Sequence, residues 1–340
     1  LRHTMIVHRR TISRQGGQTP SLLRPVTRAR WTLRRWADRV LDERVEGAIA
    51  RRVPEPQRSV EATVDRLAKS LAEVERDLFP VRHLLATGRR GNRTITEPQL
   101  ERLYQQVRTV TGVQRLAGYG RQTYRSLIEL ELRGVGRIAG STSNVLGKLM
   151  TTPLLAPPPG PVLEIGTLYG IFAGGLLRQF RRLGDARHVT VVDPLVGVQL
   201  QPGSMGGGDL SGSPVVPELV LANLRLSGAD DDEFRLIQGY STDPDTRAAA
   251  GDRSYAVVIV DGDHSEQGVY EDLRWVAGCC VDGAIVVLDD FDDPGWPGVR
   301  SGFERACADG ASFTLIGTVS TSAYLRFEAS AGDHHPRRSP

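Results

Sequence analysis

The chain has 340 residues, enough for about two domains at the usual roughly 100–200 residues each. Its apolar content of 40% and charged content of 24% are those of an ordinary globular protein. No stretch approaches the roughly 20 apolar residues of a membrane span, which excludes an integral membrane protein. Three cysteines without metal-binding spacing do not suggest a secreted disulfide scaffold. We expect a cytoplasmic protein.

The first 58 residues are strongly basic. They hold fourteen arginines and five acidic residues, whereas the whole chain has a net charge of only +3. Lysine occurs only at Lys69 and Lys148, and such a bias is typical of GC-rich coding, so the arginines are weak evidence for nucleic-acid binding. We expect residues 1–58 to be a partly disordered segment with one amphipathic helix at 31–49.

Residues 59–155 are predicted to be helical. Apolar residues recur at spacings of 4, 3, 4, 3 and 4 along a helix that must stop near Pro80. This heptad seam predicts either a homo-oligomer or packing against the chain's own helices. Thr96 followed by Gln99 is typical of a capped helix start, and a further helix is expected over 122–138. The seam comprises Val60, Val64, Leu67, Leu71, Val74 and Leu78.

Strand and helix patterns alternate after a proline-rich turn. This alternation predicts a Rossmann-like, doubly wound α/β domain over residues 156–330, with a mostly parallel seven-stranded sheet. The glycine- and serine-rich insertion at 203–214 is either a surface loop or a lid, and the tail at 331–340 is expected to be disordered. The predicted strands are Val162–Ile165, His188–Val192, Phe234–Gln238, Ala256–Val260, Ala284–Leu288, Phe313–Ile316 and Ala323–Phe327.

The first predicted strand leads into a glycine-containing turn and a helix, in the pattern Glu164-x-Gly166-x-x-x-Gly170. Glycines in such a turn let the backbone approach a ligand closely. Asp193 ends the next strand about 23 residues after Gly170, where an acid suits the diol of a ribose. A pyrophosphate cradle would need glycine in place of Leu168, and the carboxylate of Glu164 would repel phosphates. The turn therefore favours a cationic cofactor over NAD.

This turn resembles the first motif of the class I S-adenosylmethionine-dependent methyltransferases. The segment Leu236–Ser241 is similar to the third-strand motif that flanks the adenine in that family, and the resemblance covers roughly residues 161–327. It implies S-adenosylmethionine as the cofactor. The residues that it implies for cofactor binding are Glu164, Gly166, Thr167, Tyr169, Gly170, Asp193, Gly239 and Ser241.

Two apolar strands end in acidic residues, the fourth in Asp261-Gly262-Asp263-His264 and the fifth in Asp289-Asp290. Because the carboxyl ends of parallel strands share one edge, we expect a cation or proton-transfer centre there. The pair resembles the metal-dependent sugar O-methyltransferases of macrolide biosynthesis (the macrocin and mycinamicin type) and their relatives in cephalosporin biosynthesis. This resemblance implies Asp261, Asp289 and Asp290 as Mg²⁺ ligands and His264 as the general base. Those relatives often carry Glu-Asp where this chain has Asp-Asp, which shortens one ligand.

The residue types suit that chemistry. Mg²⁺ takes oxygen ligands and can hold two neighbouring sugar hydroxyls, and a histidine with its usual pKa of about 6.5 can take up a proton. Other interpretations remain open. His264 could cap the following helix, Asp289 and Asp290 could be turn residues that bind no metal, and Trp296 could either line an acceptor pocket or pack in a loop.

We therefore expect an S-adenosylmethionine-dependent O-methyltransferase that acts on a hydroxyl of a sugar or glycosylated natural product, with Mg²⁺ and a histidine base. Three alternatives remain: a metal-independent methyltransferase of phenols or amines, a regulator whose basic N-terminus binds nucleic acid or an anionic membrane, and an NAD-type oxidoreductase. The expected partners are a small-molecule acceptor and further copies of the chain; nucleic acid is not expected.

Overall fold

The computed structural model describes residues 63–74, 93–201 and 213–329. The predicted segment 1–58, the tail 331–340 and all but the end of the insertion 203–214 lie outside the described residues. By its contacts the chain forms two units, residues 1–73 and 74–340. None of the helices in the described ranges is long and apolar enough to cross a bilayer.

Residues 63–74 form a helix, as the heptad pattern predicts. The seam residues Val64, Leu67, Leu71 and Val74 are exposed, at 37–51% of their surface. An apolar stripe along a helix is normally buried against another surface in the functional protein. The expected homo-oligomer stays a prediction.

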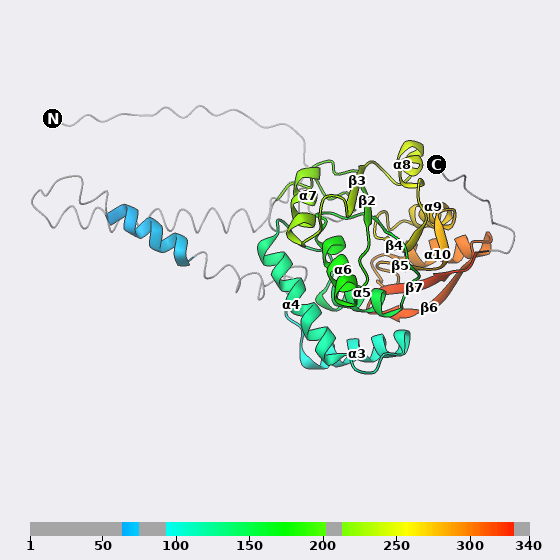
Figure 1. The fold of residues 1–340 in the computed structure, drawn as a ribbon, viewed down its shortest axis with the longest axis horizontal. Helices are drawn as coiled ribbons and strands as arrows, with labels where there is room; N and C mark the ends of the chain where they lie inside the picture. Colours follow the sequence, from blue (N-terminus) through cyan, green and yellow to red (C-terminus); the bar gives the residue numbers. More distant parts are fainter. Residues whose placement is uncertain (1–62, 75–92, 202–212, 330–340) are drawn as a thin grey trace, which may run out of the picture. The chain divides into compact units, whose positions relative to one another are not determined.

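The larger unit is built on one seven-stranded sheet with the order β3-β2-β1-β4-β5-β7-β6 (Figure 1). All strands are parallel except β7, which runs antiparallel to both β5 and β6. The predicted doubly wound fold is confirmed, with β5 starting four residues earlier than expected. The strands are β1 (Val162–Ile165), β2 (Val189–Asp193), β3 (Phe234–Gln238), β4 (Tyr255–Val260), β5 (Cys280–Leu288), β6 (Phe313–Val319) and β7 (Ser322–Phe327).

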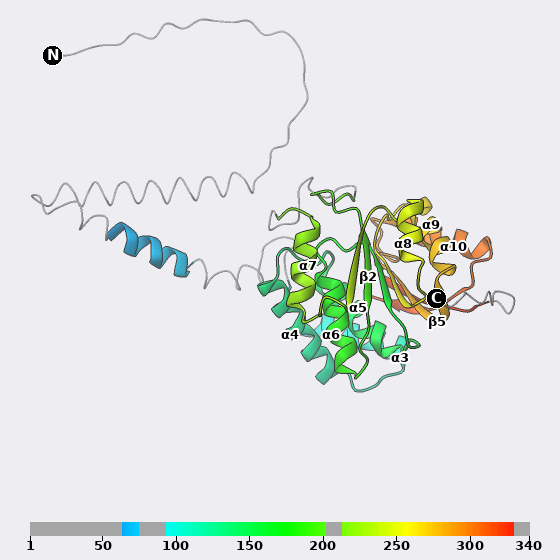
Figure 2. The same cartoon turned by 45° about the horizontal axis from the view of Figure 1, so that its top comes forward.

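Helices cover both faces of the sheet, which explains the uninterrupted apolar strands. Along β4, Val257 and Ile259 point into one hydrophobic core, whereas Val258 and Val260 point into the other, as the two-residue period of a strand requires. In Figure 2 one helix layer lies on each side of the sheet. One layer holds α6 (Ile171–Arg182) and α7 (Pro217–Leu226); the other holds α8 (Pro244–Ala250), α9 (Glu266–Ala277) and α10 (Pro297–Ala308).

Three further helices join the α6 side: α3 (Glu97–Thr111), α4 (Ala117–Arg133) and α5 (Thr142–Leu154). The capping box predicted at Thr96 is present. Helix α4 starts and ends about five residues before the prediction. Ser141 caps α5, because its hydroxyl oxygen accepts a hydrogen bond from the backbone N–H of Asn144. Helix α5 is almost wholly buried, so the region before residue 156 shares a core with the sheet.

Candidate active site

A cavity of about 460 Å³ lies at the carboxyl ends of β1, β2 and β4. The strand order reverses between β1 and β4, and ligands of open α/β sheets bind at such a switch point. Ile138 and Ala139, from the segment before α5, also line the cavity. The predicted site residues that line it are Glu164, Gly166, Thr167, Asp193, Gly239, Ser241 and Asp261.

Gly166 lets the turn after β1 pass directly beside the end of β4. Its φ angle is +80°, in the left-handed region, and a Cβ atom there would lie 2.2 Å from the carbonyl oxygen of Asp261. Only glycine accommodates both conditions. The close approach brings the cofactor motif and the acidic end of β4 into the same cavity.

The carboxylate of Asp193 holds this turn in place. Its Oδ2 atom accepts hydrogen bonds from the backbone N–H groups of Thr167 (2.8 Å) and Leu168 (3.3 Å), and its Oδ1 atom accepts from Leu195 (2.9 Å). Leu168 has a φ angle of +57°, which is costly for a residue with a side chain, so the turn needs such support. Asp193 lines the cavity as predicted, and its contact with a ribose stays a prediction.

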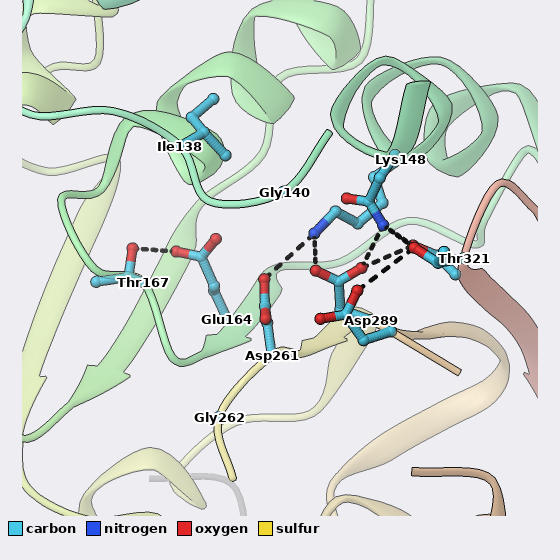
Figure 3. Close-up of polar contacts among 12 residues, drawn as sticks. Ile138, Gly140, Lys148, Glu164, Thr167, Asp261, Gly262, Asp289 and Thr321 are labelled. Carbon is cyan, nitrogen blue, oxygen red and sulfur yellow. Dashed lines mark hydrogen bonds and ion pairs between the residues drawn. The ribbon is translucent and has the colours of Figure 1, made fainter. Parts of the chain in front are cut away.

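Glu164 lies on the cavity wall and is almost fully buried. The hydroxyl of Thr167 donates a hydrogen bond to it (Figure 3). Burial raises the pKa of Glu164 to about 8, although the hydrogen bond from Thr167 acts in the opposite direction. Without a ligand this side chain is therefore mostly neutral at pH 7, and a bound cation would favour its ionised form.

Tyr169 and Gly170, which are also predicted to bind the cofactor, are not among the residues that line the cavity, and their contact with the cofactor stays a prediction. The ring of Tyr169 is buried in the core against Gly136, where a Cβ atom would lie 2.4 Å from the ring. Its hydroxyl donates to the carbonyl of Ser213. Gly170 caps α6 with a φ angle of +72° and packs against Val220. Both residues shape the turn from behind.

The acidic ends of β4 and β5 meet beside the cavity, as the sequence predicts. His264 lies between two carboxylates: its Nε2 atom is 3.4 Å from Oδ1 of Asp261, and its Nδ1 atom is 3.6 Å from Oδ2 of Asp290. The amide of Gln201 lies 3.2 Å from Nε2, and the ring of Trp296 packs edge-on at 5.0 Å. Ser265, not His264, caps α9, so the helix-cap interpretation of His264 is wrong.

The residue that sequence reasoning missed is Lys148, on α5. Its ammonium forms ion pairs with Asp289 and, at 3.2 Å, with Asp261, and its side chain is only 1% exposed (Figure 3). Burial acts to lower the pKa of Lys148, but the charges of Asp261 and Asp289 outweigh it and raise the pKa above its usual range. Lys148 is therefore charged at neutral pH.

Asp289 is saturated with donors. Its Oδ1 atom accepts from the amide of Asn144 and the hydroxyl of Ser322, both at 2.8 Å, and its Oδ2 atom accepts from Lys148. Burial acts to raise the pKa of Asp289, but Lys148 and Asn144 lower it overall. Asp290 accepts a longer hydrogen bond from the hydroxyl of Thr321 (3.4 Å), and burial together with the charges of Asp289 and Asp261 raises the pKa of Asp290 to about 7.

This arrangement does not fit a magnesium ion. Mg²⁺ requires near-octahedral oxygen ligands at about 2.0–2.1 Å, whereas the ammonium of Lys148 lies in the position that would bridge Asp261 and Asp289. Within the described ranges, no three His, Cys, Asp or Glu side chains are arranged to hold a metal ion. No chemical step is assigned to a metal here.

The sheet order defines a Rossmann-like fold with a ligand-sized cavity at its switch point. Residues 163–291 match the family model described as "Methyltransferase domain". This segment contains the turn after β1, Asp193 and both acidic strand ends. By this match, residues 163–291 are the methyltransferase-like part of the chain.

Solved structures with a similar chain path include the O-methyltransferase NovP, which is 22% identical and has a TM-score of 0.42 over 67% of this chain and 98% of its own. CalS11, a TDP-rhamnose 3'-O-methyltransferase of calicheamicin biosynthesis, is 17% identical (TM-score 0.39, 68% and 96% covered). An O-methyltransferase from Bacillus cereus is 14% identical and has a TM-score of 0.39 over 66% of this chain and 97% of its own. Likenesses at this level carry no argument about acceptor or mechanism. The search of curated proteins found no match.

Proposed function

We propose that this chain is an S-adenosylmethionine-dependent methyltransferase. It transfers the methyl group of S-adenosylmethionine to a hydroxyl oxygen of a small polar acceptor, a sugar or a glycosylated natural product. One observation carries the proposal. A single cavity is lined both by Glu164 and Asp193, which are predicted to bind the cofactor, and by Asp261 and Asp263. Carboxylates and a nearby imidazole suit an acceptor rich in hydroxyl groups.

In the proposed reaction the hydroxyl oxygen attacks the methyl carbon of the sulfonium as the carbon–sulfur bond breaks, leaving a neutral thioether. The hydroxyl proton passes to His264. Burial acts to lower the pKa of His264, but the hydrogen bond and charge of Asp261 and the charge of Asp290 outweigh it, so the pKa is raised. The two carboxylates thus favour the imidazolium that forms when the ring takes up the proton.

Alignment supplies most of the remaining acceleration. Displacement at a sulfonium carbon needs the attacking oxygen, the carbon and the sulfur in line, and a cavity that holds both reactants in a fixed orientation provides this. The close approach at Gly166 fixes the distance between the cofactor turn and Asp261. Gln201 adds a hydrogen bond to the carbonyl of Gly262 at 3.2 Å, which ties the segment after β2 to the end of β4.

The test is a methyl-transfer assay with labelled S-adenosylmethionine and three acceptor panels: sugar nucleotides and glycosides, catechols, and amines. We expect turnover with the first panel and a loss of about 10²–10⁴-fold in His264→Ala, the usual contribution of a general base. His188→Ala, which removes an exposed histidine, is the matched control. Turnover of a phenol or amine that survives His264→Ala would favour the alternative acceptor class. Calorimetry with S-adenosylhomocysteine and NAD separates the oxidoreductase alternative.

We further propose that the chain self-associates through the heptad helix that includes residues 63–74. The exposed side chains of Val64, Leu67, Leu71 and Val74 support this proposal. Light scattering of the full chain should give the mass of an oligomer, and Leu67→Glu with Leu71→Glu should give that of a monomer. A monomeric wild-type chain would contradict it.

A further inference from the structure

Lys148 occupies the place of a cation shared by two carboxylates. Its ammonium lies between Asp261, at the end of β4, and Asp289, at the end of β5 (Figure 3). The two acids come from the strand ends where the sequence resemblance implies a metal, whereas the lysine comes from α5, outside the matched segment 163–291. One positive charge from the chain itself is thus already bound at this centre.

The position of Lys148 is strongly specified by its surroundings. Asn144 lies four residues earlier on α5, so the two side chains project from the same face of the helix. Asn144 donates to one oxygen of Asp289 while Lys148 donates to the other. The ring of Phe172 lies 4.8 Å from the ammonium and adds a cation–π contact. Two carboxylates and one aromatic ring thus contact the ammonium.

We propose that the ammonium of Lys148 is a resident cation that replaces a divalent metal ion at this acidic centre, and that methyl transfer by this chain is independent of metal. Lys148 acts as a positioning residue: it binds Oδ2 of Asp261, whose Oδ1 atom faces Nε2 of His264. The charge therefore fixes the carboxylate that orients the imidazole.

This replacement changes what the acceptor must offer. A magnesium ion with open positions binds two neighbouring hydroxyl oxygens and so favours a vicinal diol. An ammonium whose protons are already directed at Asp261 and Asp289 provides no such pair of positions. The acceptor of this chain needs only the one hydroxyl that is methylated. An isolated hydroxyl should be methylated as well as one of a vicinal pair.

The role of His264 in this inference rests on the proposed function, but the metal test does not require an acceptor. The first experiment is a Mn²⁺ titration of the full wild-type chain, followed by electron paramagnetic resonance. We expect no stoichiometric binding. One bound equivalent that disappears in Asp289→Asn would overturn the inference, because the ammonium would then only fill a metal site in the absence of its ion.

The second experiment removes the charge. Lys148→Met keeps an unbranched side chain that is one atom shorter, and Lys69→Met removes the same charge from an exposed position as the matched control. We expect Lys148→Met to bind one Mn²⁺ more than about tenfold tighter than Lys69→Met, because two carboxylates then lack a counter-charge. Adding Asp289→Asn to Lys148→Met should abolish that binding.

A folded Lys148→Met chain that binds no Mn²⁺ would also overturn the inference, since the two carboxylates would then not form a cation site. If this variant fails to fold, the wild-type titration decides alone. A chain that methylates none of the offered acceptors but gains Mn²⁺ binding on Lys148→Met would contradict the proposed function and leave this inference intact.

Discussion

Arg93 forms a two-pronged ion pair with Glu131, and both side chains are fully buried. The same guanidinium donates to the backbone carbonyls of Ile138 and Gly140, in the segment between α4 and α5. Ile138 and Ala139 from this segment line the cofactor cavity. A residue just before α3 therefore fixes one wall of the candidate active site.

We predict that Arg93→Ala lowers the free energy of unfolding by about 3–5 kcal/mol, because it removes the guanidinium that lies 2.7 Å from the buried carboxylate of Glu131 and leaves Arg137 at 3.8 Å. Arg133→Ala breaks the exposed pair with Glu129 and should cost less than about 1 kcal/mol. Denaturant unfolding measures both. Equal losses in the two variants would show that the buried pair does not stabilise the fold.

Arg93→Ala should also weaken the binding of S-adenosylhomocysteine. The affinity should fall about tenfold if reordering the cavity wall costs about 1.4 kcal/mol. Calorimetry on the folded fraction of Arg93→Ala measures this. An unchanged affinity would mean that Ile138 and Ala139 keep their places without the guanidinium.

Gly166→Ala should abolish cofactor binding. Its Cβ atom would lie 2.2 Å from a backbone oxygen at a φ angle of +80°, so the turn or the end of β4 must move. We also expect a loss of about 1–3 kcal/mol in stability. Gly118→Ala, in α4 with no atom within 4 Å of the added carbon, should be neutral or stabilising by up to about 1 kcal/mol. Normal binding by Gly166→Ala would place the cofactor elsewhere.

Cofactor binding should release a proton near pH 7. The pKa of Glu164 is about 8 in the free chain, so its carboxyl is mostly protonated there, and the positive charges of S-adenosylmethionine favour its ionised form. Affinity should rise with pH up to about 8 and then level off. Calorimetry in buffers of different ionisation enthalpy counts the released protons. Glu164→Gln should release none, and equal release by both chains would assign the proton to another group.

Without cofactor, the carboxyl group of Glu164 should lower the stability of the folded chain as the pH rises. The pKa of Glu164 is raised on folding, from 4.5 to about 8, so the folded chain binds this proton more tightly than the unfolded chain. The free energy of unfolding should fall between those two pH values. Thermal unfolding of Glu164→Gln, measured over the same pH range, should lack this fall in the free energy of unfolding. A steeper pH dependence in the variant would contradict the assignment.

Asp193→Asn tests whether this carboxylate contacts the ribose or only supports the turn. Three backbone N–H groups donate hydrogen bonds to the carboxylate of Asp193, and the variant removes its negative charge. We therefore expect a loss of about 1–3 kcal/mol in the free energy of unfolding. If Asp193 also binds the ribose, the loss of affinity should be larger for S-adenosylhomocysteine than for an analogue without ribose hydroxyls. Equal losses for the two ligands would limit Asp193 to the turn.

The sheet and the acidic strand ends could be predicted because the signals are local. A β-branched run such as Val257–Val260 has one structural solution when both faces of a sheet are covered, and parallel strands deliver Asp261 and Asp289 to one edge. The direction of a single side chain in a turn is less local. Tyr169 matched the cofactor motif by position, but Gly136 leaves space for its ring in the core.

Lys148 could not be paired from the sequence, because its partners Asp261 and Asp289 follow more than one hundred residues later. One signal was present. Lys148 is one of two lysines in the chain and lies in the apolar run of α5, where an unpaired charge would be very costly. A lysine at this position therefore predicts a buried acidic partner, but it does not indicate which acidic residue that partner is.

The contribution of α5 has a practical consequence for dividing the chain. A shortened protein that starts at Pro157 would retain all seven strands and the whole of residues 163–291. It would lack Asn144 and Lys148, and the apolar side of the sheet that α5 covers would face water. Such a fragment would carry the recognisable sequence motifs and an unbalanced pair of carboxylates. Truncations and domain fusions should therefore keep the chain from before Arg93 onward.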